Sequence, residues 1–190
     1  MNFSKEFLDK VIISTKLIDL TEIERIVEIL YDLRERKGRL FIIGSGGGAG
    51  HSSHAACDFI KLCSIQAYSL DNLSLLTALT NDVGYENTLV HWLSSFNFTV
   101  NDCIMVISVG GGTINVSRNI FYAVSKAKAM NAKIIGILGP VGGETAKLAD
   151  AKILIQAKSE VTPITEGLQA IIWHLLVSHP KLATHKPVWI

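Results

Sequence analysis

Five short apolar runs, each followed by a glycine or a polar turn, most strongly constrain how this chain can fold. They lie at residues 39–43, 65–69, 102–108, 133–138 and 152–156. Continuous runs of Val, Ile and Leu are typical of strands buried on both faces of a parallel sheet. Helical patterns fill the segments between them, at 51–63, 72–80, 86–96, 114–130, 143–149 and 163–178. The alternation predicts an α/β fold with a three-layer, doubly wound, five-stranded parallel sheet and right-handed crossovers.

The first 37 residues have a different pattern, with apolar side chains at three- and four-residue steps. This periodicity predicts helices. Thr21 is followed three residues later by Glu24, the spacing of a capping box, which predicts that a second helix begins at Thr21. Because no linker or low-complexity segment interrupts the chain, we expect one domain over residues 1–190, with helical arms at 1–37 and the sheet core at 38–190.

Charge and composition limit the possible partners. The chain has 18 Lys and Arg residues against 17 Asp and Glu, a balance that argues against a nucleic-acid partner. Only 18% of the residues are charged and the mean hydropathy is +0.34, so we expect apolar surface to be buried between copies of the chain. The apolar runs are too short to cross a bilayer, the first residues lack a signal-peptide core, and three cysteines are too few for a disulfide framework. We therefore expect a cytoplasmic protein with no membrane partner.

Two glycine-rich loops each follow a predicted strand and precede a predicted helix. The candidate binding residues are Ser45, Gly46, Gly47 and Gly48 in the first loop and Ser108, Gly110 and Thr113 in the second. Glycines let the backbone approach a ligand closely, and the amide groups at a helix N-terminus favour an anion. Both loops follow strands of a parallel sheet, and ligands bind at the carboxyl ends of such strands. A role in tight turns alone is the alternative for either loop.

A dinucleotide-binding fold competes with this interpretation. Gly44, Gly46 and Ala49 fit the pattern G-x-G-x-x-A, and Asp71 follows the second predicted strand, where a ribose-binding carboxylate is expected. The fingerprint does not explain the second glycine loop, and no further region remains to bring a substrate to a nicotinamide. We therefore expect no nucleotide cofactor.

Four side chains on two predicted helices could perform acid–base chemistry. His54 and Asp58 are four residues apart and share a helix face, while Glu166 and His174 are eight apart, a little over two turns. Each histidine alone is readily explained as a partly buried side chain. Together, two carboxylates and two imidazoles suit either general acid–base catalysis or a divalent metal such as zinc.

A third candidate lies between the second and third predicted strands. Asn81 and Asp82 stand next to Gly84 and predict a turn. This polar pair can bind substrate hydroxyls if the turn folds over the site.

These motifs resemble the sugar isomerase (SIS) domain family, and within it the phosphoheptose isomerase group. The resemblance covers nearly the whole chain and rests on both glycine loops, on His54-x-x-x-Asp58, on the segment 76–85, and on Glu166 with His174. It implies a five-stranded parallel sheet and a homotetramer with sites at subunit interfaces. It also implies an enzyme that converts sedoheptulose 7-phosphate to a heptose 7-phosphate for cell-envelope polysaccharide, in some members with zinc bound.

The resemblance also implies roles for individual residues in substrate binding. The phosphate would be bound by the side chains of Ser45, Ser108 and Thr113. Backbone groups of both loops would contribute, at Gly46, Gly47, Gly48 and Gly110. Asn81 and Asp82 would bind substrate hydroxyls.

Asp58 takes the position of the family's catalytic glutamate, and His174 matches its catalytic histidine. The metal set would be His54, Asp58, Glu166 and His174, with Glu166 also near the substrate. A carboxylate and an imidazole facing each other across an enediol suit aldose–ketose isomerisation, which needs a base beside a carbonyl and an acid for the oxygens.

This sequence departs from the family pattern at three places. Asp58 is one methylene shorter than glutamate, and about 1 Å of misplacement can cost roughly 100-fold in rate. Gly110 and Gly112 remove side-chain donors from the second loop, and Glu166 replaces a glutamine, which favours a bound metal. A non-catalytic, phosphosugar-binding or regulatory member of the family, for example one that binds a replication initiator, is therefore the alternative function.

Overall fold

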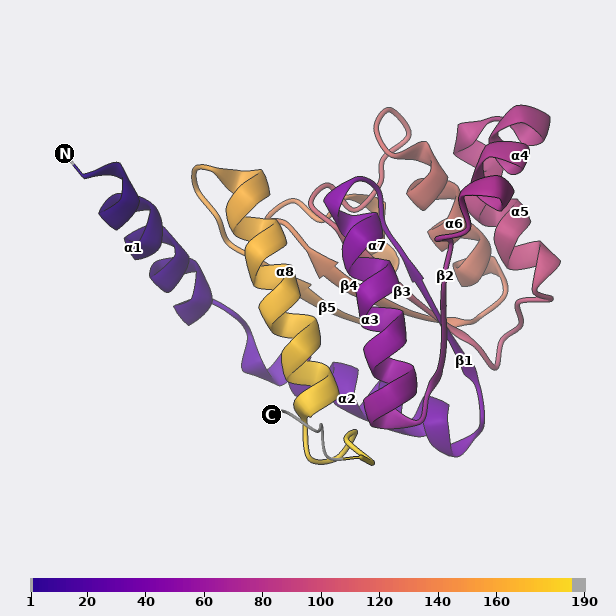
Figure 1. The fold of residues 1–190 in the computed structure, drawn as a ribbon, viewed down its shortest axis with the longest axis horizontal. Helices are drawn as coiled ribbons and strands as arrows, with labels where there is room; N and C mark the ends of the chain where they lie inside the picture. The colour runs from indigo at the N-terminus through magenta and orange to yellow at the C-terminus, as the bar shows by residue number, and fades with distance from the viewer. Residues whose placement is uncertain (1, 186–190) are drawn as a thin grey trace.

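A five-stranded parallel sheet is the centre of the computed structural model, which describes residues 2–185 (Figure 1). The strand order is β2-β1-β3-β4-β5, and every neighbouring pair is parallel. The strands are β1 (Arg39–Ile43), β2 (Gln66–Ser69), β3 (Cys103–Ser108), β4 (Lys133–Leu138) and β5 (Ala151–Leu154). The α/β fold predicted from the apolar runs is confirmed.

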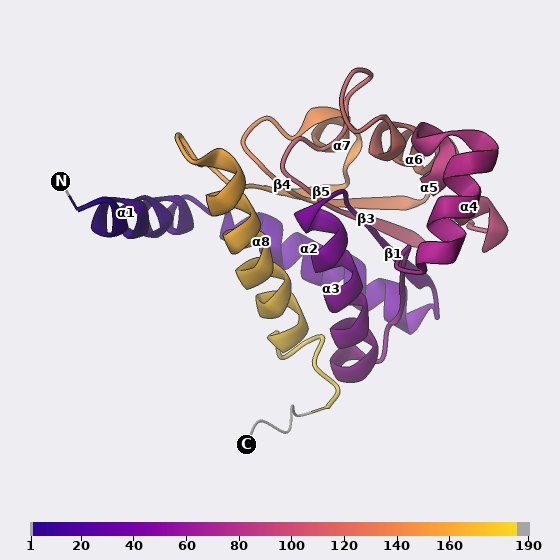
Figure 2. The same cartoon turned by 45° about the horizontal axis from the view of Figure 1, so that its top comes forward.

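Helices cover both faces of the sheet (Figure 2). They are α1 (Phe3–Lys16), α2 (Leu20–Glu35), α3 (Gly47–Cys63), α4 (Leu73–Val83), α5 (Thr88–Ser95), α6 (Arg118–Ala129), α7 (Gly143–Leu148) and α8 (Val161–Ser178), with a 3-10 turn, η1, at Tyr85–Asn87.

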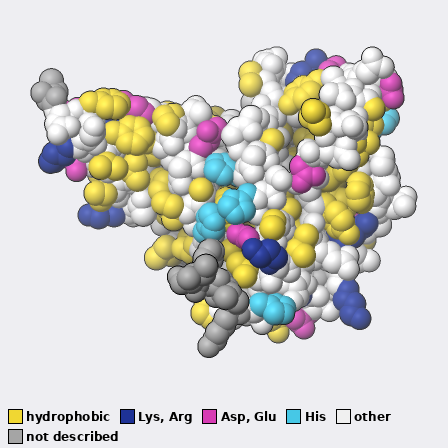
Figure 3. Space-filling model, viewed as in Figure 1, with side chains coloured by type: hydrophobic (Ala, Val, Ile, Leu, Met, Phe, Trp, Pro, Cys, Tyr) yellow, Lys and Arg dark blue, Asp and Glu magenta, His cyan; other side chains and the backbone are white. Residues whose placement is uncertain are grey.

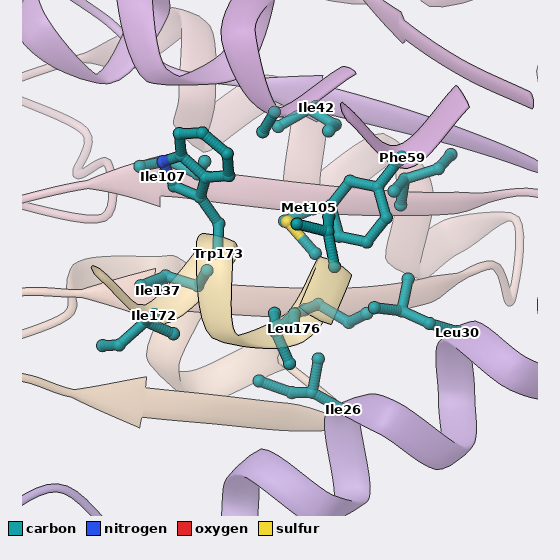
Figure 4. Close-up of a cluster of buried hydrophobic side chains, with 14 of the residues drawn as sticks. Ile26, Leu30, Ile42, Phe59, Met105, Ile107, Ile137, Ile172, Trp173 and Leu176 are labelled. Carbon is teal, nitrogen blue, oxygen red and sulfur yellow. The ribbon is translucent and has the colours of Figure 1, made fainter. Parts of the chain in front are cut away.

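Each face of the sheet has its own hydrophobic core. Side chains alternate along β1, so that Leu40 and Ile42 pack under α2, α3 and α8, whereas Phe41 and Ile43 pack under α5 and α6. Figure 4 shows the first of these cores, in which Trp173 of α8 lies among side chains of the sheet and of α3. The first core holds both α3 and α8 on one face of the sheet, and these two helices carry the candidate catalytic residues.

Several predicted boundaries were wrong for identifiable reasons. Helix α2 begins at Leu20 because the Asp19 side chain, not Thr21, caps it by accepting hydrogen bonds from two backbone amides. Helix α3 begins at Gly47, inside the first glycine loop. Residues 114–117 are not helical, because the Thr113 hydroxyl oxygen accepts backbone N–H groups from Asn115 and Val116 and forms a turn.

The N-terminal helix α1 extends away from the sheet (Figures 1 and 2). It is tied to the body by an ion pair between Lys10 and Glu160 at 2.8 Å and by a hydrogen bond from Ser14 to the Gln156 carbonyl. Much of its apolar surface is exposed, at Phe3, Leu8, Ile12 and Ile13, and so is Leu17, the residue that follows it. Among residues 2–185, no helix is long and apolar enough to cross a membrane.

Candidate active site

The first glycine loop is packed tightly onto the end of a neighbouring strand. A Cβ atom built on Gly48 would lie 2.2 Å from the Ile107 carbonyl oxygen of β3, and one built on Gly44 would lie 2.6 Å from it. Gly46, the N-cap of α3, has φ 59° and ψ −125°, a conformation that side-chain-bearing residues rarely adopt. Glycine at these positions therefore brings the N-terminus of α3 against the carboxyl end of β3, where the second loop begins.

The second loop is held by α7. The Gly111 carbonyl accepts hydrogen bonds from the backbone and the hydroxyl of Thr145, and the Gly112 carbonyl accepts one from the Glu144 amide. In a trans peptide, the carbonyl of one residue and the amide of the next point in opposite directions. The Gly112 amide, which shares its peptide bond with the Gly111 carbonyl, therefore points away from α7. Gly110 differs from its neighbours, since a Cβ atom on it would have no atom within 4 Å.

The predicted phosphate-binding hydroxyls have unequal freedom. The Ser108 oxygen accepts the Gly111 amide at 3.1 Å, which leaves its proton available to a ligand. The Thr113 hydroxyl is engaged in folding its own turn. Ser45 has only long contacts, to the Tyr85 hydroxyl at 3.4 Å and from the Asn119 amide at 3.4 Å. Ser45 and Ser108 therefore retain more hydrogen-bonding capacity for a ligand than Thr113 does.

The structure brings three of the four predicted acid–base residues together. Ligating atoms of His54, Asp58 and His174 all lie within 4.8 Å of one another. His54 and Asp58 come from one face of α3, and His174 comes from α8, which packs beside it. Figure 3 shows histidine, acidic and basic side chains gathered on this face of the molecule. Asp58 is buried and His54 is exposed, so the group opens to solvent on one side.

Neighbouring groups orient the three side chains. Asp58 lies between two nitrogen-bearing side chains, with His54 Nε2 3.6 Å from one carboxylate oxygen and Lys61 Nζ 3.6 Å from the other. His174 Nδ1 is 2.8 Å from the Ala170 carbonyl oxygen, which can only accept, so Nδ1 carries the proton. A neutral His174 therefore presents the lone pair of Nε2, the form that binds a metal or accepts a proton.

Buried Trp173 supports this arrangement from the side of the hydrophobic core. Its ring centroid is 4.7 Å from that of His54, in an edge-on contact, and the indole stacks on His174. The His54 and His174 rings are 5.4 Å apart and nearly perpendicular. The imidazoles are thus packed in place by an anchored aromatic side chain.

Glu166, the fourth predicted metal ligand, does not belong to this group. Its carboxylate lies against the backbone of Gly47, where a Cβ atom would be 2.6 Å from a Glu166 oxygen. Eight residues of helix advance about 12 Å along the axis. Glu166 and His174 therefore lie on the same side of α8 but about two turns apart along it. The carboxylate instead occupies the N-terminus of α3, where the helix dipole favours negative charge.

Asn81 and Asp82 lie in the last turn of α4 rather than in a turn after it. Helix α4 continues to Val83 and is ended by Gly84 with φ 79°. Both side chains are exposed, and they bond to each other at 3.0 Å. A cavity of about 160 Å³ beside the first loop is lined instead by Ser45, Tyr85 and Asn119, among other residues. Asn119 was not among the residues singled out in the sequence, because no motif contains it.

The fold and site define an α/β protein with two glycine loops at the carboxyl edge of a parallel sheet and an imidazole–carboxylate group nearby. The SIS domain family model matches residues 6–139. The chain therefore belongs to the SIS domain family, as its motifs predicted.

Two relatives and a solved structure agree with this assignment. The chain is 29% identical over 180 residues to phosphoheptose isomerase of Helicobacter pylori, covering 90% of each chain. It is 30% identical over 167 residues to a probable phosphoheptose isomerase of Thermoplasma volcanium, covering 85% of this chain and 82% of that one. The structure of phosphoheptose isomerase from Neisseria gonorrhoeae superimposes with a TM-score of 0.79 at 21% identity, covering 92% of this chain and 94% of the other.

Proposed function

We propose that this chain is an aldose–ketose isomerase acting on a phosphorylated seven-carbon sugar, of the type that converts sedoheptulose 7-phosphate to D-glycero-D-manno-heptose 7-phosphate. The proximity of Asp58 and His174, within 4.8 Å, carries the proposal. The names of the relatives from Helicobacter pylori and Thermoplasma volcanium support the substrate class. The same observations favour a sugar phosphate over the dinucleotide that the first loop alone would allow.

The chemistry moves one proton between adjacent carbons. Asp58 removes a proton from the carbon beside the ketone, which gives an enediol, and protonation of the former carbonyl carbon completes the aldose. His174 transfers the proton between the two oxygens through Nε2. Ser45, Ser108, Thr113 and the loop amides bind the phosphoryl group, and Asn81 and Asp82 approach the hydroxyls if α4 closes over the site.

We also propose that the site can take up a divalent metal, zinc in the first place, on His54, Asp58 and His174. With a metal bound, the Asp58 oxygen and the His174 Nε2 would be ligands, so the proton transfers described above belong to the metal-free site. The three donors, two imidazole nitrogens and a carboxylate oxygen, are those that zinc prefers. A metal here supplies Lewis-acid polarisation of the substrate's oxygens. His174 fits this role because the Ala170 carbonyl fixes its tautomer.

The test of function is direct. Purified protein mixed with sedoheptulose 7-phosphate is followed by NMR for the aldose signal, with zinc, nickel, manganese or no added metal. We expect product in at least one condition and its loss in Asp58→Asn and His174→Ala. Absence of product under every condition overturns the isomerase proposal.

Metal content is measured separately from activity. Elemental analysis of untagged protein should give zinc bound to the wild type and its loss in His54→Ala and Asp58→Ala. His91→Ala, which changes a histidine outside the group, is the matched control. Full zinc retention by Asp58→Ala contradicts the proposed ligand set.

The chain is further proposed to work in the cytoplasm as a homotetramer with sites at subunit interfaces, supplying a heptose for cell-envelope polysaccharide. The exposed apolar side chains of α1 and the open side of the imidazole group support an interface. One domain of the SIS type, spanning residues 1–190, is proposed as the repeating unit.

A non-catalytic, phosphosugar-binding member of the family is the second candidate. The open space at Gly110 favours it, because a side-chain donor would fit there and is missing. This candidate predicts calorimetric binding of sedoheptulose 7-phosphate without turnover, and recovery of a protein partner in pull-down experiments. Turnover by the wild type rejects it.

A further inference from the structure

Asn119 combines deep burial with an unsatisfied hydrogen-bonding group. The side chain belongs to the first turn of α6 and is 3% exposed. Its Nδ2 is 3.4 Å from Ser45 Oγ, at the outer limit of a hydrogen bond, and its Oδ1 has no partner. A buried amide oxygen without a partner carries the full cost of losing its bond to water, so the residue needs an explanation beyond packing.

The surroundings of Asn119 point to a ligand. The residue lines the 160 Å³ cavity beside the first glycine loop. The hydroxyls of Ser52, Ser69 and Thr88, in the same cavity, already donate to protein oxygens at 2.7–2.9 Å.

Three polar side chains of the cavity retain unused hydrogen-bonding capacity: Ser45, Tyr85 and Asn119. The Ser45–Tyr85 contact is also long, at 3.4 Å, and Tyr85 is 49% exposed. These groups therefore close the cavity only loosely, and a ligand can separate them at little cost.

The chemistry of Oδ1 selects the part of the ligand that it can bind. An amide oxygen is an acceptor and needs an O–H or N–H donor. A phosphoryl dianion has no proton to donate, whereas every hydroxyl of a sugar chain has one. The Tyr85 hydroxyl, which lines the same cavity, can both donate and accept, so it can complete the contacts of that same hydroxyl.

We propose that Asn119 is a specificity-determining residue, whose Oδ1 accepts a hydrogen bond from a hydroxyl group on the carbon chain of the phosphosugar. The inference rests on the proposed function and deepens it, because it separates recognition of the sugar chain from recognition of the phosphate. The ligand enters by displacing the long Ser45–Tyr85 contact, after which Asn119 has a partner on each side of its carboxamide.

Calorimetric titration of the whole protein tests the inference with two probes, sedoheptulose 7-phosphate and inorganic phosphate. Asn119→Leu keeps the size of the side chain and removes its polar atoms. We expect its affinity for the sugar phosphate to fall about 10- to 100-fold, since a site built to bind a hydroxyl loses that bond. Its affinity for inorganic phosphate should stay unchanged. Asn115→Leu, in the exposed loop before α6, is the control and should bind both probes like the wild type.

The outcomes separate this inference from the proposed function. Equal loss of both affinities, or no loss, overturns the role of Asn119 alone. A wild type that binds no sugar phosphate overturns the proposed function and the inference with it.

A second measurement covers the case in which Asn119→Leu does not fold. The side-chain amide NMR signals of Asn119 in the wild type should shift with the sugar phosphate and not with inorganic phosphate. The same shift with both ligands, or with neither, contradicts the inference.

Discussion

Asp102 carries one of the most constrained charges outside the candidate site. The carboxylate is buried, which by itself raises its pKa, but hydrogen bonds from Arg39 and from the Thr99 amide outweigh burial and hold the pKa below its usual value. Two Arg39 nitrogens contact it, Nε at 2.9 Å and Nη2 at 2.8 Å. The paired charges join the start of β1 to the turn that precedes β3.

Asp102→Asn should lower the free energy of unfolding by about 3 kcal/mol at neutral pH, because Arg39 loses its only carboxylate partner among the described residues and keeps just the Phe96 and Asn97 carbonyls. The lowered pKa means that the wild-type contribution is complete above the unfolded value of about 3.9 and is lost as pH falls through the folded value. Urea unfolding at several pH values should therefore show the two proteins converging in acid. Asp9→Asn, which removes an exposed ion pair with Lys5, is the control and should change little. A constant difference down to pH 2 would contradict the assignment.

The candidate site was predictable at single residues only where spacing along one helix decides position. His54 and Asp58 are four apart, which places them on one face whatever the tertiary fold, and the structure agrees. Glu166 was misplaced because its distance from His174 depends on helix rise as well as on helix face. Asn119 was missed because its contact with Ser45 exists only after α6 packs beside the first loop.

At the scale of elements, the glycines of the second loop have separate roles. Gly111 has φ 66°, and a Cβ atom on it would lie 1.9 Å from the Gly142 carbonyl oxygen. A Cβ atom built on Gly110, in contrast, would have no atom within 4 Å. The loop is therefore shaped by close contact of its backbone with the start of α7 at one glycine, and it is free to change at the other.

Gly111→Ala should destabilise the protein by about 1–3 kcal/mol, since it adds strain in φ to a clash with backbone. Gly110→Ala, one residue away, should leave the thermal midpoint nearly unchanged. Calorimetric unfolding of both variants makes the comparison. Equal stability of the two variants would show that the loop does not depend on its contact with α7.

The central strands β1, β3 and β4 were predicted within one residue because nearly all of their side chains are buried, so composition alone marks them. The edge strands β2 and β5 are only partly buried and were predicted within two residues. The start of α3 was missed because Gly47, Gly48 and Gly50 are poor helix formers. Gly48 packs against the Ile107 carbonyl of β3 and Gly47 against the Glu166 side chain, and local propensity records neither contact. Helix α6 likewise begins later than predicted because the Thr113 turn precedes it.

At the scale of the whole molecule, α1 is the element with the least explained surface. Leu8 is 60% exposed and Ile12 is 53% exposed on a helix that extends from the sheet. The low charge content of the sequence predicted such surface but not its location, because composition carries no position. The proposed burial against other copies of the chain would account for it.

Leu8→Glu combined with Ile12→Glu should reduce the proposed tetramer to a smaller species, since charges replace the apolar area. Light scattering after size-exclusion chromatography gives the mass. Lys16→Glu, which alters charge without removing apolar surface, should keep the wild-type mass. A wild type that is a monomer, or a double variant of unchanged mass, refutes the proposed role of α1.

The pair of imidazoles has a practical consequence for anyone who purifies this protein. The ring centroids of His54 and His174 lie 5.4 Å apart, and the group opens to solvent on one side. At this spacing both imidazoles can bind one immobilised nickel ion. The untagged chain should therefore be retained on a nickel resin and elute with imidazole. Nickel from the resin would then occupy the site, so the metal content and activity of a preparation would depend on how the protein was purified.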